Sequence, residues 1–148
     1  LMRMAFVSLF ALAGLAGQAR AENVEGSWEF RTDIRNKGCT IQGVMLIGPE
    51  DPVSGARDCS FVSAETCGPF DDTPIEMEQS CTINKDGDFF EIRSTVIGSL
   101  TEGRGIDGYL PDHFTVRPRE AGRMSGTWFD RNYADLVEFW RTRSGATS

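Results

Sequence analysis

The sequence predicts an all-β fold: a small antiparallel β-barrel of about eight strands, linked by two disulfides. Three observations predict it. Apolar and polar residues alternate with a period of two along most of the chain, clusters of glycine and proline separate the alternating segments, and there are four cysteines. The alternation is typical of half-buried antiparallel strands rather than of amphipathic helices. Sequential hairpins favour an up-and-down barrel, because closure removes exposed sheet edges.

The first 21 residues have the pattern of a secretory signal peptide. Arg3 supplies a positive charge, residues 5–16 are uncharged and mostly apolar, and small residues at 19 and 21 suit cleavage after Ala21. The apolar run is too short to cross a bilayer, which takes about 20 residues. We therefore expect a periplasmic or secreted protein with one domain, residues 22–148; a retained N-terminal anchor is the alternative.

The charge of the expected mature chain is strongly negative. Removal of Arg3 and Arg20 lowers the 15 basic residues to 13, against 22 acidic residues, which gives a net charge of −9. This charge repels nucleic acid and anionic lipid head groups, so neither is an expected partner. No second long apolar segment follows residue 21. The mature chain is therefore not expected to be an integral membrane protein.

The first strand is expected over 24–34, where the two faces separate cleanly. Trp28, Phe30 and Ile34 share one face, while charged residues occupy the other. Turn residues bound each further segment of this kind. The other strands are expected at about 39–47, 58–64, 75–83, 88–97, 113–117, 123–129 and 136–143.

The clearest hairpin joins 75–83 to 88–97. Between them lies Asn84-Lys85-Asp86-Gly87, in which Gly87 suits a left-handed turn position. The glycine-rich segment 98–112 that follows the hairpin is expected to be a long loop.

The four cysteines, Cys39, Cys59, Cys67 and Cys81, predict two disulfides. Their spacings of 20, 8 and 14 residues do not match the close pairs of a zinc site. Antiparallel partners lie symmetrically about their turn, which favours Cys39–Cys67, centred on residue 53, and Cys59–Cys81, centred on residue 70. Sequential pairing, Cys39–Cys59 with Cys67–Cys81, remains the alternative.

Gly26-Ser27-Trp28 opens the first strand. This Gly-x-Trp resembles the signature of the calycins, the lipocalin and avidin group of eight-stranded barrels. In lipocalins the Trp closes one barrel end and packs on an Arg of the last strand, so the resemblance implies a closure formed by Gly26, Trp28 and Arg141, with Arg143 as the second choice. It also implies a small apolar ligand. The chain departs from lipocalins in one respect: only 130–135 separates its last two strands, where lipocalins carry a helix.

The inward positions predict a filled interior rather than a roomy pocket, because an eight-stranded barrel is just wide enough to be filled by large side chains. The bulky residues expected inside are Trp28, Phe30, Phe90, Ile92, Phe114, Trp128 and Phe139.

No catalytic, cofactor or metal site is expected. His113 is the sole histidine, and no Gly-x-Ser-x-Gly turn accompanies it. Asn84-x-Asp86-x-Asp88 superficially resembles calcium ligands, but a helical-hand loop needs glycine at its sixth position, where this chain has Phe89. The sequence thus predicts a protein that is not an enzyme.

Two functions remain open. The first is a binding module whose candidate loop carries Tyr109, Leu110 and Pro111, with a small ligand, a peptide or a protease as its partner. The alternative is a structural or accessory envelope protein docked on a larger periplasmic complex. The sequence does not choose between them.

Overall fold

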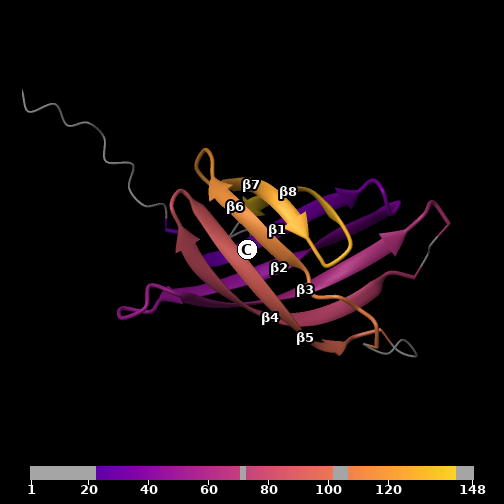
Figure 1. The fold of residues 1–148 in the computed structure, drawn as a ribbon, viewed down its shortest axis with the longest axis horizontal. Helices are drawn as coiled ribbons and strands as arrows, with labels where there is room; N and C mark the ends of the chain where they lie inside the picture. Colours follow the sequence, from indigo (N-terminus) through magenta and orange to yellow (C-terminus); the bar gives the residue numbers. More distant parts are fainter. Residues whose placement is uncertain (1–22, 71–72, 102–106, 143–148) are drawn as a thin grey trace, which may run out of the picture.

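The computed structural model describes residues 23–70, 73–101 and 107–142 (Figure 1). The predicted signal peptide, residues 1–21, and Arg143 lie outside the described residues.

The described chain forms eight antiparallel strands that close into a barrel in sequence order (Figure 1). The fold class predicted from the sequence is confirmed. The strands are β1 (Gly26–Ile34), β2 (Cys39–Glu50), β3 (Arg57–Cys67), β4 (Ile75–Asp86), β5 (Phe89–Ser99), β6 (His113–Pro118), β7 (Arg123–Phe129) and β8 (Ala134–Arg141).

Most strands match their predicted ranges, but several are longer than the alternation indicates. β2 continues to Glu50, which pairs with Arg57, and β3 continues to Cys67. These extensions arise because hydrogen bonding between hairpin partners continues past the last apolar residue. β8 begins at Ala134, two residues earlier than expected, because Ala134 already pairs with Phe129 of β7.

Closure depends on the first and last strands. β1 pairs with β8 from Trp28 opposite Arg141 to Thr32 opposite Val137, so no sheet edge remains along this seam. Among the described residues, no helix is long and apolar enough to cross a membrane.

An aromatic cluster fills the middle of the barrel. The rings of Phe30, Phe61, Phe114 and Phe139 lie with centroids 5.2–5.7 Å apart, mostly edge to face, which is a favourable geometry for aromatic pairs. Trp28 is fully buried beside this cluster. The prediction of a filled interior is therefore correct for this part of the barrel.

The disulfide pairing predicted from symmetry is confirmed. Cys39 lies opposite Cys67 in the β2–β3 register, and Cys59 lies opposite Cys81 in the β3–β4 register. Both pairs are bonded, with Cα atoms 4.1 and 4.8 Å apart. The two bonds link three consecutive strands.

The up-and-down topology gives the barrel two distinct ends. The closed end carries Trp28, Arg141 and the β2–β3, β4–β5 and β6–β7 turns. The open end carries the β1–β2 and β7–β8 turns and the β3–β4 and β5–β6 connections. Residues far apart in sequence therefore meet at each end.

Candidate functional site

At the closed end, the structure brings together the three residues that the calycin resemblance implies. The Arg141 guanidinium lies 4.5 Å from the centre of the Trp28 ring and donates hydrogen bonds to the carbonyl oxygens of Glu25, at 2.8 Å, and Asn23. Gly26 has a φ of +125°, and a Cβ there would lie 3.0 Å from the guanidinium. The backbone and the arginine therefore cover this end of the interior.

The open end contains a cavity of about 180 Å³. The β1–β2 turn, β3, the segment before β6 and the β7–β8 turn surround it. Its lining residues are Lys37, Ile41, Glu65, Gly108, Tyr109, Leu110, Asp112, Asp130, Asn132 and Tyr133.

A buried carboxylate forms part of the cavity wall. Asp112 is only 1% exposed. Its Oδ1 accepts a hydrogen bond from Trp128 Nε1 at 2.8 Å, and its Oδ2 accepts from Gln79 Nε2 at 2.7 Å and from the Tyr109 hydroxyl at 3.2 Å. The backbone N–H of Asp112 donates back to Gln79 Oε1 at 3.0 Å. These bonds attach the segment before β6 to the barrel wall.

Burial shifts the acid–base properties of this network. It raises the pKa of Asp112 to about 6, while hydrogen bonds from Gln79 and Trp128 oppose the shift and the charge of Glu65 adds to it. Burial, followed by the negative charges of Asp112 and Glu65, also raises the pKa of Tyr109. The phenol is therefore a neutral hydrogen-bond donor at physiological pH.

The only lysine of the cavity is paired within it. Lys37 Nζ lies 2.8 Å from Glu65 Oε1 and 5.6 Å from the centre of the Tyr133 ring. Burial lowers the pKa of Lys37, but the hydrogen bond and charge of Glu65 outweigh it, so the pKa is raised. The lysine therefore stays charged.

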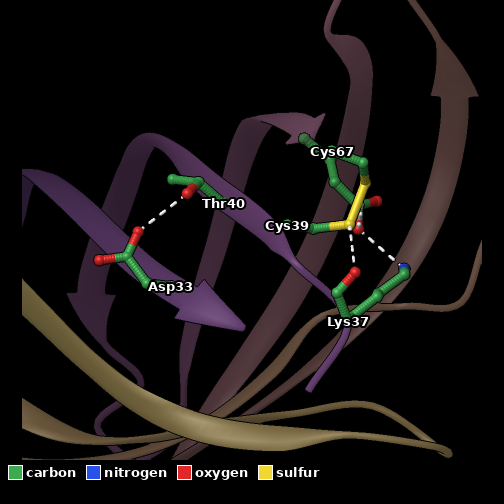
Figure 2. Close-up of a disulfide and its surroundings, with 6 residues drawn as sticks. Asp33, Lys37, Cys39, Thr40 and Cys67 are labelled. Carbon is green, nitrogen blue, oxygen red and sulfur yellow. Dashed lines mark hydrogen bonds and ion pairs between the residues drawn. A yellow bond between two sulfur atoms is a disulfide. The ribbon is translucent and has the colours of Figure 1, made fainter. Parts of the chain in front are cut away.

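Figure 2 shows Lys37 next to the Cys39–Cys67 disulfide. The two sulfur atoms lie within 4.8 Å of a Glu65 carboxylate oxygen. This group does not form a metal site, because metal binding requires thiolates and both sulfurs are oxidised.

Asp130 contributes a second carboxylate from the β7–β8 turn. Its Oδ1 accepts hydrogen bonds from the backbone N–H groups of Asn132 and Tyr133, both at 2.7 Å. Within the described residues, no hydrogen bond or ion pair engages its Oδ2. One carboxylate oxygen thus remains available at the cavity.

The candidate loop residues divide between the cavity and its surroundings. Tyr109 and Leu110 line the cavity, whereas Pro111 does not. Sequence reasoning missed the buried polar residues at this end of the barrel. Gln79 and Glu65 occupy inward positions of alternating strands. A polar residue among the apolar residues of such a face is the sequence feature that could have identified them. Nothing in the local sequence indicated that Asp112 would reach Gln79.

The other sequence candidates lie elsewhere. His113 Nδ1 accepts a hydrogen bond from the Ser94 backbone N–H at 3.0 Å, and burial lowers its pKa. Its ring packs on Phe129. Asn84 and Asp86 are exposed at the end of β4, next to the turn that contains Gly87.

A larger groove of about 630 Å³ lies on the outer face of β1, β7 and β8. Four of its six charged side chains form pairs: Arg31 with Asp33 at 3.1 Å and Arg35 with Asp135 at 3.2 Å. The exposed fractions of Arg31 and Asp33 exceed half, so solvent already screens that pair. The open-end cavity is therefore the better candidate site.

Solved structures support the fold. A redesigned β-barrel shares 15% identity, with a TM-score of 0.55 over 81% of this chain and 91% of its own. A de novo designed fluorescence-activating barrel shares 18% identity, with a TM-score of 0.51 over 80% and 93%. Another redesigned barrel, solved with bound DFHBI, shares 12% identity, with a TM-score of 0.51 over 80% and 94%.

At these identities the likeness concerns the fold alone. No family model and no curated protein sequence matches the chain significantly. The eight-stranded barrel expected from the calycin resemblance is present, and the relationship to calycins stays a prediction. The two disulfides indicate a non-reducing environment.

Proposed function

We propose that this chain is an exported, non-catalytic binding module that holds a small ligand in its open-end cavity. The observation that carries the proposal is the asymmetry of the barrel. Trp28 and Arg141 cover one end, aromatic rings fill the middle, and a cavity with buried polar groups remains at the other. Cavities with a few precisely placed polar groups are typical ligand sites.

The size of the cavity limits the ligand. An apolar cavity of about 150 Å³ is enough for benzene, so a cavity of about 180 Å³ suits a molecule with one small ring. The calycin resemblance implies an apolar ligand, but the aromatic cluster occupies the apolar interior and charged residues line the remaining space. A small polar ligand therefore fits better.

Non-catalytic binding is supported by the arrangement of the reactive groups. Within the described part of the chain, the imidazole of His113 already bonds to the Ser94 backbone and packs on Phe129, without a nucleophile hydrogen-bonded to it. Export is supported by the disulfides and by the signal-like pattern of residues 1–21.

The test is a ligand screen read by NMR on the oxidised protein. A cavity ligand should shift the indole N–H signal of Trp128, which bonds to Asp112, and leave that of Trp28 at the closed end unchanged. It should also raise the melting temperature. Shifts confined to Trp140 would assign binding to the outer groove and contradict the proposal. Stable association with a large envelope complex, without any Trp128 response, would favour the accessory role.

A further inference from the structure

The open-end cavity contains more negative than positive charge. Among the described residues that line it, Glu65, Asp112 and Asp130 supply three carboxylates, and Lys37 supplies the one positive charge. Lys37 is already hydrogen-bonded to Glu65 at 2.8 Å. Within the described residues, Asp112 and Asp130 therefore form no ion pair, although the charge of Asp130 also acts on Lys37.

Asp112 is the more unusual of the two. Within the described residues it takes part in no ion pair, although it is almost completely buried. Its hydrogen-bond donors Gln79, Trp128 and Tyr109 are all neutral. Buried charges in proteins are ordinarily paired with an opposite charge, because removing an ion from water is costly.

We propose that the ligand of this cavity is a small organic ammonium ion, which places its cationic head against the carboxylates of Asp130 and Asp112. This inference rests on the proposed function, which it makes more specific. An ammonium group supplies the missing positive charge, and Asp130 Oδ2 offers a free acceptor for a charge-assisted hydrogen bond.

The remaining lining favours an organic cation over a metal ion. Tyr109 and Tyr133 provide aromatic rings, and Ile41 and Leu110 provide apolar surface. Aromatic faces attract ammonium groups. A Ca²⁺ ion needs six to eight oxygen ligands, and of the three carboxylates in the described lining Glu65 is already paired with Lys37.

An anion is a poor match as well. Its natural partner would be Lys37, and reaching it would require breaking the ion pair with the buried Glu65, leaving that carboxylate unpaired.

The experiment compares four probes with the oxidised protein: benzylammonium, benzyl alcohol, benzoate and CaCl₂. The three organic probes share a benzyl or phenyl ring and differ in charge. Benzylammonium should raise the melting temperature and shift the Trp128 indole signal, and the other three should do neither. Binding of benzyl alcohol or benzoate at Trp128 would overturn the ammonium assignment and leave the proposed function intact. If no small molecule in the wider screen shifts the Trp128 signal, the ammonium assignment and the proposed function are both contradicted.

Asp130→Asn tests the site with little risk to folding, because an amide oxygen can still accept the two turn hydrogen bonds. It should weaken benzylammonium binding about ten-fold, the usual size of one charge-assisted hydrogen bond. Asp51→Asn is the matched control. Asp51 accepts the same pair of backbone N–H bonds, from Val53 and Ser54, in the β2–β3 turn at the closed end.

Equal affinity in the Asp130→Asn and Asp51→Asn variants would show that benzylammonium binds elsewhere on the acidic surface, and this would overturn the inference. A calcium response that Asp130→Asn abolishes, without a benzylammonium response, would make the site a metal site and would equally overturn it.

Discussion

At the scale of single residues, a few buried polar side chains distinguish this barrel from a purely apolar one. Gln79 is fully buried, and its amide contacts Asp112 through both its nitrogen and its oxygen. Such two-way contacts allow one geometry only, since each donor meets an acceptor. The carboxylate that lines the cavity is therefore held in place by the barrel wall.

The contact between Trp28 and Arg141 predicts coupled stabilities. Trp28→Ala should lower the free energy of unfolding by about 3–5 kcal/mol, as other large core truncations do. Arg141→Ala should lower it less, by about 0.5–2 kcal/mol for the lost cation–π contact. Urea unfolding of the two single mutants and the double mutant measures the coupling. Fully additive losses would mean that the residues do not interact.

Asp112 predicts an unusual dependence of stability on pH. Its pKa is about 6 in the folded chain against 3.8 for an aspartate in water, so the folded state binds a proton more tightly than the unfolded state. Stability should therefore rise as pH falls through 6, by about 1 kcal/mol between pH 7.5 and pH 5. Comparing unfolding free energies at these two pH values in wild type and Asp112→Asn isolates the effect. If the Asp112→Asn variant gains the same stability at pH 5, another group causes the pH dependence.

At the scale of strands, register and close packing decide which substitutions the barrel tolerates. Gly126 in β7 lies opposite Val116 of β6 and Val137 of β8. A Cβ at Gly126 would lie 1.9 Å from the carbonyl oxygen of Thr115, whereas a Cβ at Gly98 in β5 would meet nothing within 4 Å. The two strand glycines therefore have different structural roles.

Gly126→Ala should lower the free energy of unfolding by about 1–3 kcal/mol, because β6 and β7 must move apart to admit the methyl group. Gly98→Ala is the control and should be neutral or slightly stabilising, since alanine lowers the entropy of the unfolded chain. Chemical denaturation of both variants gives the comparison. Equal losses would show that β6 and β7 are not this close.

Each disulfide should add stability by restricting the unfolded chain. The cysteines are 28 and 22 residues apart in sequence, which predicts about 3–4 kcal/mol for each bond. Replacing Cys39 and Cys67 together by alanine should lower the free energy of unfolding by this amount, and so should replacing Cys59 and Cys81. Non-reducing peptide mapping of the wild type is the companion measurement, and Cys39–Cys59 peptides would contradict the pairing.

At the scale of the whole molecule, sheet closure and the two disulfides together stabilise the barrel. The disulfides connect β2, β3 and β4, while the seam between β1 and β8 is held by hydrogen bonds and packing. An exported protein meets the oxidising conditions that the two bonds require.

Export makes a prediction about mass. Protein collected outside the cytoplasm of a bacterial host should begin at Glu22, because the small residues Ala19 and Ala21 flank the expected cleavage site. Two disulfides should reduce its intact mass by four hydrogens, and reduction should restore them. A mass that includes residues 5–16 would refute the predicted cleavage.

The sequence by itself determined the strands and the hairpin at Gly87, and it favoured the cysteine pairs that the structure shows. These depend on short-range properties: side-chain alternation reflects the pleat of one strand, and Cys39 and Cys67 face each other once their strands pair in register about the intervening turn. The alternation also placed Trp28 and Phe30 inside, as the structure shows.

Only the tertiary structure decided where the cavity lies and what lines it. Asp112 and Gln79 are 33 residues apart, and each looks ordinary in its own segment. They meet because closure brings β4, β7 and the segment that precedes β6 around one barrel end. Strand register then sets which side chains lie at the same height along the barrel axis. Lys37 and Glu65 meet through a single hairpin, because Lys37 lies in the turn that precedes β2 and Glu65 lies on its partner β3; the contact of Asp112 with Gln79 depends on the closed geometry of the whole sheet.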